Sequence, residues 1–170
     1  MKLSELLLPE FDREMAHTRK CLERLPEDKL DWRPHPRSWT MGELTTHIVH
    51  LPAWGMETLR NDALNMTPPE GEQLPRPQLI QSSGEALTRF DRNVAEVRRL
   101  LETASDEHLL ASWTLLDGDR TIFVMPRIAV LRTFFMNHII HHRAQLGVYL
   151  RMNEVSLPAL YGPSADEAPL

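Results

Sequence analysis

Four stretches of this chain carry apolar residues three and four positions apart, which is the spacing of one face of an α-helix. Such stripes constrain the fold strongly, because each helix must bury its apolar face against the others. The stripes lie in residues 3–25, 41–64, 87–101 and 127–152. At this chain length, the pattern predicts an all-α four-helix bundle that residues 1–170 form as a single domain.

Prolines and capping sequences mark the breaks between these helices. The first helix is expected to end near Pro26, and Thr40 to Glu43 fits a capping box at the start of the second. Pro52 lies inside the second apolar stripe and is expected to kink that helix or end it early. Residues 65–81 contain four prolines and predict a long crossover loop.

One short region interrupts the helical pattern before the last helix. Residues 113–116 and 121–124 are rich in apolar and β-branched side chains and flank an Asp117-Gly118 turn sequence. This arrangement predicts a small β-hairpin. No strand is expected elsewhere, and the proline-containing tail from Asn153 onward is expected to be extended.

Composition narrows the classes of partner. The formal net charge is -5 and the pI about 5.9, which argues against nucleic acid, because phosphate binding needs a basic surface. No stretch approaches the roughly 20 apolar residues of a membrane span, and the N-terminal apolar run is too short for a signal peptide. A cytoplasmic protein that acts on a small molecule is expected. The single cysteine, Cys21, allows no intramolecular disulfide and is expected to be buried.

Two histidines in the last helix suggest a metal site. His138 and His142 are four residues apart, so they project from the same helix face, and Phe135 and Leu146 place that face toward the core. Two imidazoles in this arrangement can share one metal ion. The same spacing also arises by chance, with either ring packed as a core histidine. Ile139 follows His138 where zincins have glutamate, so the pair brings no general base of its own.

A third ligand must come from another helix. His47 is the first candidate because it follows Leu44 by three residues and so faces inward, and His50 remains an alternative on a neighbouring position. His141 is rotated by about 100° from the pair and is expected to be exposed or in an interface. Three neutral imidazoles with an open position are typical of catalytic metal sites. The remaining histidines are expected on the surface or in loops: His17, His35 and His108.

Three segments, in this order, resemble the signatures of the DinB/YfiT-like superfamily of metal-binding four-helix proteins. They are Leu30-Asp31-Trp32-Arg33-Pro34 followed by Ser38 to Leu44 and His47, then His138 to Gln145, then Leu160 to Glu167. The resemblance implies an up-down-down-up bundle, a metal triad of His47, His138 and His142, and a homodimer. One departure is Ala144, where the family often has glycine.

The resemblance also implies a choice of activities, since characterised relatives include transferases and isomerases that use bacillithiol, mycothiol or glutathione. A three-histidine metal can bind such a thiol as thiolate, or it can activate water for hydrolysis. Hydrolysis usually needs a carboxylate base, and the helix faces that carry the histidines offer none at a predictable position. A thiol transferase with zinc or nickel is therefore expected. A metal-dependent hydrolase and a non-catalytic, metal-binding stress-response protein are the alternatives.

Four further residues are candidates for the surroundings of the site. Glu43 is expected either to orient His47 or to complete the helix cap. Gln145 either lines the cavity or packs, and Arg143 either binds the carboxylate of a thiol or forms a surface ion pair. Trp39, like Trp32 and Trp54, either roofs the pocket or packs in the core.

Overall fold

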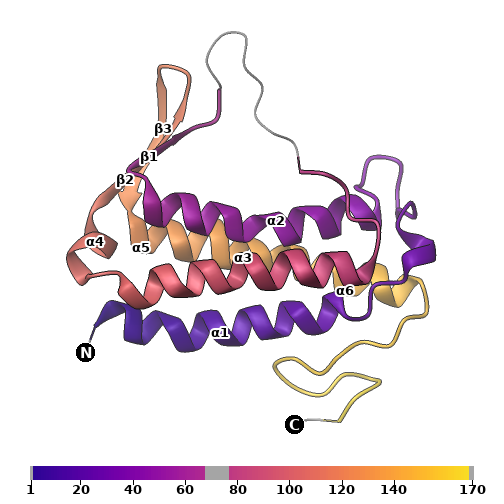
Figure 1. Cartoon of the computed structure of the whole chain (residues 1–170). Coiled ribbons are helices and arrows are strands. Elements are labelled where there is room, and N and C mark those ends of the chain that lie inside the picture. Colours follow the sequence, from indigo (N-terminus) through magenta and orange to yellow (C-terminus); the bar gives the residue numbers. More distant parts are fainter. Residues whose placement is uncertain (1, 68–76, 169–170) are drawn as a thin grey trace.

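The computed structural model describes residues 2–67 and 77–168 and has four long helices with a small sheet at one end (Figure 1). The expected all-α bundle with a hairpin before the last helix is confirmed. The long helices are α1 (Leu3–Leu22), α2 (Met41–Arg60), α3 (Ser83–Thr103) and α6 (Asn137–Met152). Shorter helical elements are η1 (Glu27–Lys29), α4 (Asp106–Leu110), α5 (Arg127–Val130) and the π-helical η2 (Leu131–Met136).

The four long helices follow an up-down-down-up order. α1 and α6 run in one direction and α2 and α3 in the other (Figure 1). α2 packs against α3 and α6, and α1 packs against the same two helices, so each helix has two neighbours around one core. Much of the predicted crossover loop, residues 68–76, lies outside the described residues.

α2 ends earlier than the sequence predicts. The apolar pattern favoured a helix to about residue 64, whereas α2 passes through Pro52 and ends at Arg60. The carbonyl groups of its last turn are taken by side chains from elsewhere. Arg127 Nε donates to the Thr58 carbonyl at 3.1 Å, and a ring nitrogen of His108 lies 2.9 Å from the Leu59 carbonyl. Because these partners satisfy groups that another turn would have used, the helix stops there.

The sheet contains the predicted hairpin and one strand that was not expected. β2 (Ser112–Asp117) pairs antiparallel with β3 (Arg120–Pro126), and Gly118 adopts a φ of 59° in the turn between them. β1 (Ala63–Asn65) follows α2 and pairs parallel with β2. The expectation that strand occurs only in the hairpin was therefore wrong. Three residues are too few to show the two-residue alternation by which a strand is recognised.

The apolar stripes meet in two clusters. The main core fills the space between the four long helices, and its largest fully buried members include Phe11, Leu22, Ile48, Phe90 and Phe135. Cys21 belongs to this core, as predicted. A smaller cluster of Trp113, Leu115 and Val130 joins the hairpin to the start of the last helical run.

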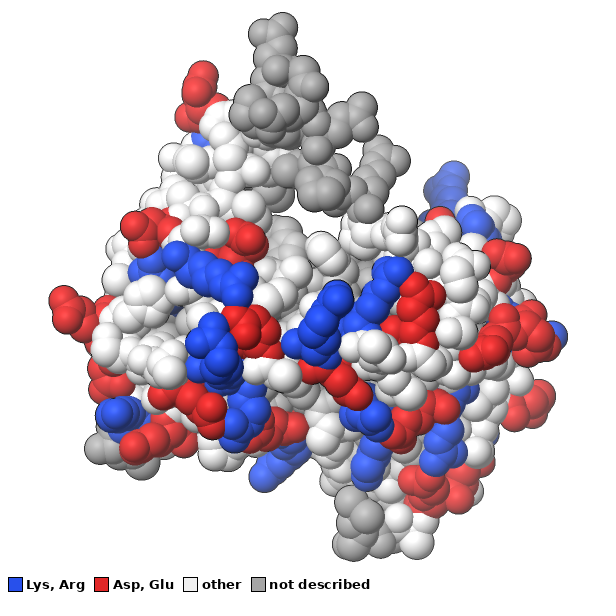
Figure 2. All heavy atoms as spheres, viewed as in Figure 1, with Lys and Arg blue, Asp and Glu red and all other residues white. Residues whose placement is uncertain are grey.

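Charged side chains of both signs are mixed over the face seen in Figure 2. Some of them join neighbouring helices: Arg98 pairs with Asp12 at 2.9 Å and Arg19 with Asp91 at 3.0 Å, and both pairs link α3 to α1.

No helix in the two described ranges combines the length and the apolar character needed to cross a membrane.

Two glycines within helices provide a test of the core packing. A Cβ at Gly55 would lie 3.1 Å from Phe135 Cδ1 and 3.3 Å from Val97 Cγ2, whereas a Cβ at Gly147 would meet nothing within 4 Å. Alanine at Gly55 is expected to cost about 1–3 kcal/mol through overpacking. Gly147→Ala is expected to stabilise the protein by about 0.5–1 kcal/mol, because alanine favours the helix. Denaturant unfolding measures the free energy of unfolding of both variants. Equal stabilities would show that Gly55 is not tightly packed against Phe135 and Val97.

Candidate metal centre

The start of α2 fixes the position of His47. Thr40 Oγ1 accepts a hydrogen bond from the Glu43 amide at 3.1 Å, and Glu43 Oε2 accepts one from the Thr40 amide at 2.7 Å. This confirms the predicted capping box and gives Glu43 its role as a cap. Leu44 and Ile48 are buried on the same helix and set its rotation, so that the half-buried His47 faces α6.

The other two histidines follow a π-helical stretch. η2 ends at Met136, and α6 carries His138 in its first turn and His142 one turn later. A π-helical turn holds more residues than an α-helical turn, so it changes which side chains share a face, and such turns often occur at functional sites. Within this stretch, Phe134 packs against the small cluster of Trp113, Leu115 and Val130, and Phe135 packs in the main core.

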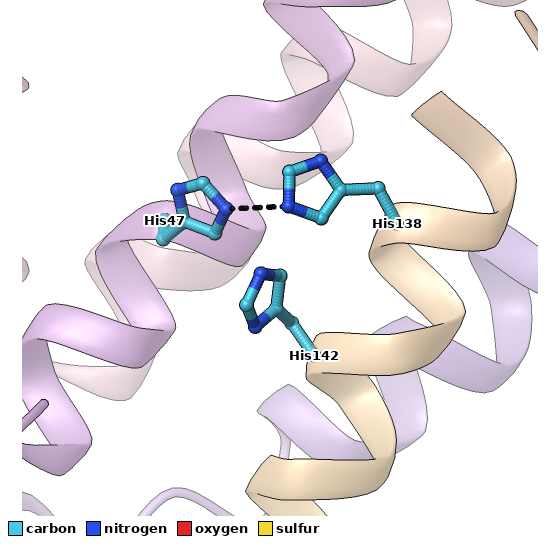
Figure 3. Close-up of side chains that lie close together, drawn as sticks. All are labelled: His47, His138 and His142. Carbon is cyan, nitrogen blue, oxygen red and sulfur yellow. Dashed lines mark hydrogen bonds between the residues drawn. The ribbon is translucent and has the colours of Figure 1, made fainter. Parts of the chain in front are cut away.

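The three rings converge between α2 and α6 (Figure 3). His47 Nε2 lies 3.3 Å from His138 Nε2, and one nitrogen from each of the three histidines lies within 4.8 Å of the other two. Imidazole nitrogens bind zinc at about 2.0–2.1 Å, so two of them at tetrahedral positions lie roughly 3.3 Å apart. The group could therefore hold a metal ion.

The structure also separates these histidines from their neighbours. His50, the alternative ligand, does not belong to the group in the described part of the chain. His141 is exposed, as predicted, and although its ring centroid lies 4.8 Å from that of His142 it is not part of the group either. The histidines that the sequence analysis selected first are thus the ones that come together.

Gln145 orients the ring of His142. Its Oε1 lies 2.7 Å from His142 Nδ1. Because an amide oxygen only accepts hydrogen bonds, Nδ1 carries the proton and Nε2 is left with a free lone pair. A hydrogen bond of this kind sets both the tautomer and the direction of a ligand histidine. Two roles were considered for Gln145, lining the cavity or packing. Its contact with His142 and its place in the lining of the adjoining pocket favour the first.

The surroundings keep the three rings neutral. Burial, followed by the nearby His142 and His138, lowers the pKa of His47 from 6.5 to about 4. Burial also lowers the pKa of His138 and of His142, although the hydrogen bonds that these rings donate to the Phe134 backbone and to Gln145 act in the opposite direction. Metal ions bind only the neutral form of imidazole, so at neutral pH these rings need not lose a proton to bind one.

Trp39 lies against the rings and borders a pocket beside them. Its ring centroid is 4.9 Å from that of His47 and 5.4 Å from that of His142. Tyr149 holds the loop in place by donating a hydrogen bond to the Trp39 carbonyl at 3.2 Å. The adjoining pocket has a volume of about 270 Å³ and is lined by Arg37, Ser38, Trp39, Leu44, His142, Gln145 and Tyr149.

The other two tryptophans lie elsewhere. Trp32 packs against the main core and against Tyr149, at 5.4 Å between ring centroids. Trp54 packs against the small cluster under the sheet. Of the three tryptophans considered as a roof, Trp39 alone contacts the histidine rings among the described aromatic pairs.

Arg143 forms an ion pair, but not the surface ion pair that was one of its two predicted roles. Its side chain is buried and pairs with Glu14 at 2.8 Å, so this is not a surface ion pair. Tyr161 Oη lies 2.6 Å from both Arg143 Nη2 and Glu14 Oε2, which ties the C-terminal segment to the pair. Glu14 thus compensates the charge of Arg143 inside the bundle.

The three histidines that were expected on the surface or in loops differ in their burial. His35 is exposed as predicted, but His17 is buried on α1 with its ring 5.0 Å from that of Tyr161. His108 is half-buried and faces the end of α2. The prediction for His17 was wrong because Tyr161, which packs against it, is distant in the sequence and meets α1 only in the folded protein.

Sequence reasoning missed several residues of the site and its support. Glu14 gave a signal, since a carboxylate three residues after Phe11 lies on an apolar stripe and needs a partner there. Arg37 and Tyr149 gave none. Arg37 lies in an irregular loop, and the aromatic ring of Tyr149 fits an apolar stripe as well as a pocket wall.

Gln145 can be tested by replacement. Gln145→Leu removes the acceptor for His142 Nδ1, and loss of such a hydrogen bond is expected to weaken metal binding by about 10- to 100-fold. Gln145→Glu keeps an acceptor at this position and is the matched control. Competition with a chelator measures both affinities. Wild-type affinity in the leucine variant would show that the hydrogen bond does not orient the ring.

Acid is expected to destabilise the metal-free protein through His47. Between pH 6.5 and about 4 the unfolded chain binds a proton at His47 that the folded protein does not bind. Stability therefore falls as the pH drops through this window, by at most about 1.4 kcal/mol per pH unit. Denaturant unfolding at pH 7 and pH 5 should show a smaller loss for His47→Gln than for the wild type. Equal losses would contradict the lowered pKa.

Comparisons with known proteins agree with this architecture. The profile of the DinB family matches residues 1–168. The chain is 26% identical over 160 residues to the uncharacterized protein YrdA of Bacillus subtilis strain 168, covering 94% of this chain and 89% of that protein.

Two solved structures share the fold. A DinB-like protein from Bacillus cereus ATCC 10987 superimposes with a TM-score of 0.69 at 24% identity, covering 91% of this chain and 95% of the other. A DinB-like protein from Bacillus subtilis gives a TM-score of 0.65 at 20% identity, covering 90% and 95%. With a profile match that spans nearly the whole chain, a shared bundle and a three-histidine group, this protein belongs to the DinB family.

Proposed function

We propose that His47, His138 and His142 bind one divalent transition-metal ion, and that the protein uses it to transfer a low-molecular-weight thiol to an electrophilic substrate. The observation that carries the proposal is the convergence of three neutral imidazoles beside an open pocket of about 270 Å³. Three protein ligands and access for a further ligand are typical of catalytic metal sites.

The composition of the site favours a thiol over water as the nucleophile. A bound divalent cation lowers the pKa of a coordinating thiol, so that thiolate chemistry needs no separate base. Hydrolysis usually requires a carboxylate near the attacking water. The group that could hold the metal contains no carboxylate among the described residues, and the nearby Glu43 is engaged by the Thr40 amide.

The transfer itself is a substitution at carbon. The thiol proton is released to solvent, a sulfur–carbon bond forms, and the bond from that carbon to the leaving group breaks, with the electron pair going to the leaving group. The chain contributes binding and orientation: Trp39 covers one side of the rings, Gln145 fixes His142, and the pocket admits the reactants.

Zinc and nickel are the metals we propose, because both suit imidazole ligands and neither demands a carboxylate.

We also propose that the protein forms a homodimer. On α6, Val148 and Met152 are each more than half exposed and supply an apolar surface for a second copy.

The ligand assignment is tested by measuring metal content in purified variants. His47→Ala, His138→Ala and His142→Ala are each expected to lose most bound zinc or nickel, because two imidazoles hold the ion much less tightly than three. His141→Ala and His50→Ala are the matched controls and are expected to keep it. Loss of the metal in His50→Ala but not in His47→Ala would require a different triad.

An assay on the loaded protein then separates the possible activities. Several thiols are tested with a model electrophile, and thioether formation that needs both the metal and the triad is the expected result. Metal binding without turnover of any thiol would favour a non-catalytic protein. Metal-dependent hydrolysis of an ester without any thiol would favour a hydrolase.

A further inference from the structure

The pocket beside the three histidines has one wall at the metal group and another at a loop arginine. His142 and Gln145 form the first wall, and Arg37 lies in the second. Trp39 and Tyr149 line the space between them. At about 270 Å³ the pocket is slightly smaller than typical ligand sites, so it suits a compact molecule that touches the metal and the arginine together.

Arg37 carries a charge that the described part of the protein does not compensate. Its backbone amide donates to His35 Nδ1 at 3.1 Å, while the guanidinium makes no ion pair or hydrogen bond with a described residue. Two other arginines near the site are engaged. Arg33 lies 4.0 Å from Glu43, and Arg143 is buried against Glu14.

We infer that Arg37 binds a carboxylate of the thiol, so that the co-substrate is a small carboxylate-bearing thiol whose sulfur reaches the metal. This inference rests on the function proposed above and names the class of thiol. A guanidinium recognises a carboxylate through two parallel hydrogen bonds, which fixes orientation as well as charge.

The charge of the whole protein supports the need for such a contact. With a net charge of -5, the protein does not attract anions in general, so an anionic ligand requires a local cation. Arg37 lies at the exposed side of the pocket, where solvent weakens ion pairs, and its effect is therefore expected to be modest.

The test uses the full-length protein loaded with Co²⁺, whose visible absorption changes when a thiol binds to it. The probes are 3-mercaptopropionate and its methyl ester, which differ in the carboxylate. The ratio of the Kd of the ester to the Kd of the acid is measured for wild type, Arg37→Gln and Arg33→Gln. Arg33 belongs to the same loop but does not line the pocket, so its variant is the matched control.

The ratio is expected to fall roughly three- to tenfold in Arg37→Gln, because the variant loses a partly exposed charge-assisted contact. It should stay at the wild-type value in Arg33→Gln, and the affinity for Co²⁺ should be equal in all three proteins. A rise in salt concentration should reduce the ratio in the wild type but not in Arg37→Gln.

Two results would overturn the inference while leaving the proposed metal chemistry intact: an unchanged ratio in Arg37→Gln, or an equal fall in Arg33→Gln. Failure of the proposed function gives a different result. In that case the wild-type protein either does not bind Co²⁺ or shows no spectral response to either probe.

Discussion

The site depends on the antiparallel packing of α2 against α6. That contact brings His47 Nε2 to within 3.3 Å of His138 Nε2 and places His142 beside both. Two protonated rings so close would repel each other, and burial adds to the cost of charging them. The same packing thus explains why the rings stay neutral and why one nitrogen of each ring lies within 4.8 Å of the other two.

The rotation and position of each helix are fixed outside the site. For α2, the capping box holds one end, and Arg127 and His108 bind the carbonyls of the last turn at the other. For α6, the adjacent residues His142 and Arg143 face different neighbours. Arg143 reaches Glu14 on α1, and a rotation that broke this buried pair would leave an uncompensated charge inside the bundle. The rotation that pairs Arg143 therefore also points His142 toward His47.

The sequence predicted those parts that rest on local patterns. Helical periodicity located the four helices, the capping box located the start of α2, and the four-residue spacing located His138 and His142 on one face. The position of Leu44 showed which face of the second helix points inward and so favoured His47 over His50. In the structure, His47 lies in the three-histidine group.

The remaining features depend on contacts between distant segments. β1 forms because β2 lies beside it, and α2 ends at Arg60 because Arg127 and His108 reach its last carbonyls. The π-helical stretch before His138, which contains Phe134 and Phe135, has no recognised sequence signal here. Arg143 was misjudged because its partner is 129 residues away.

The site divides its tasks between helices and a loop. Rigid helices carry the three histidines, whose geometry must be accurate for metal binding. The open side is formed by the loop before α2, which is held by hydrogen bonds from the Met41 amide to the Trp32 carbonyl and from the Gly42 amide to the Leu30 carbonyl, both 2.8 Å. Any side chain at Gly42 would press on the Leu30 carbonyl, because a Cβ there would lie 3.2 Å from it. Loops accept changes in sequence more readily than packed helices do. Under the proposed function, the bundle keeps one metal chemistry while residues of this loop, such as Arg37, determine which molecule reaches the metal.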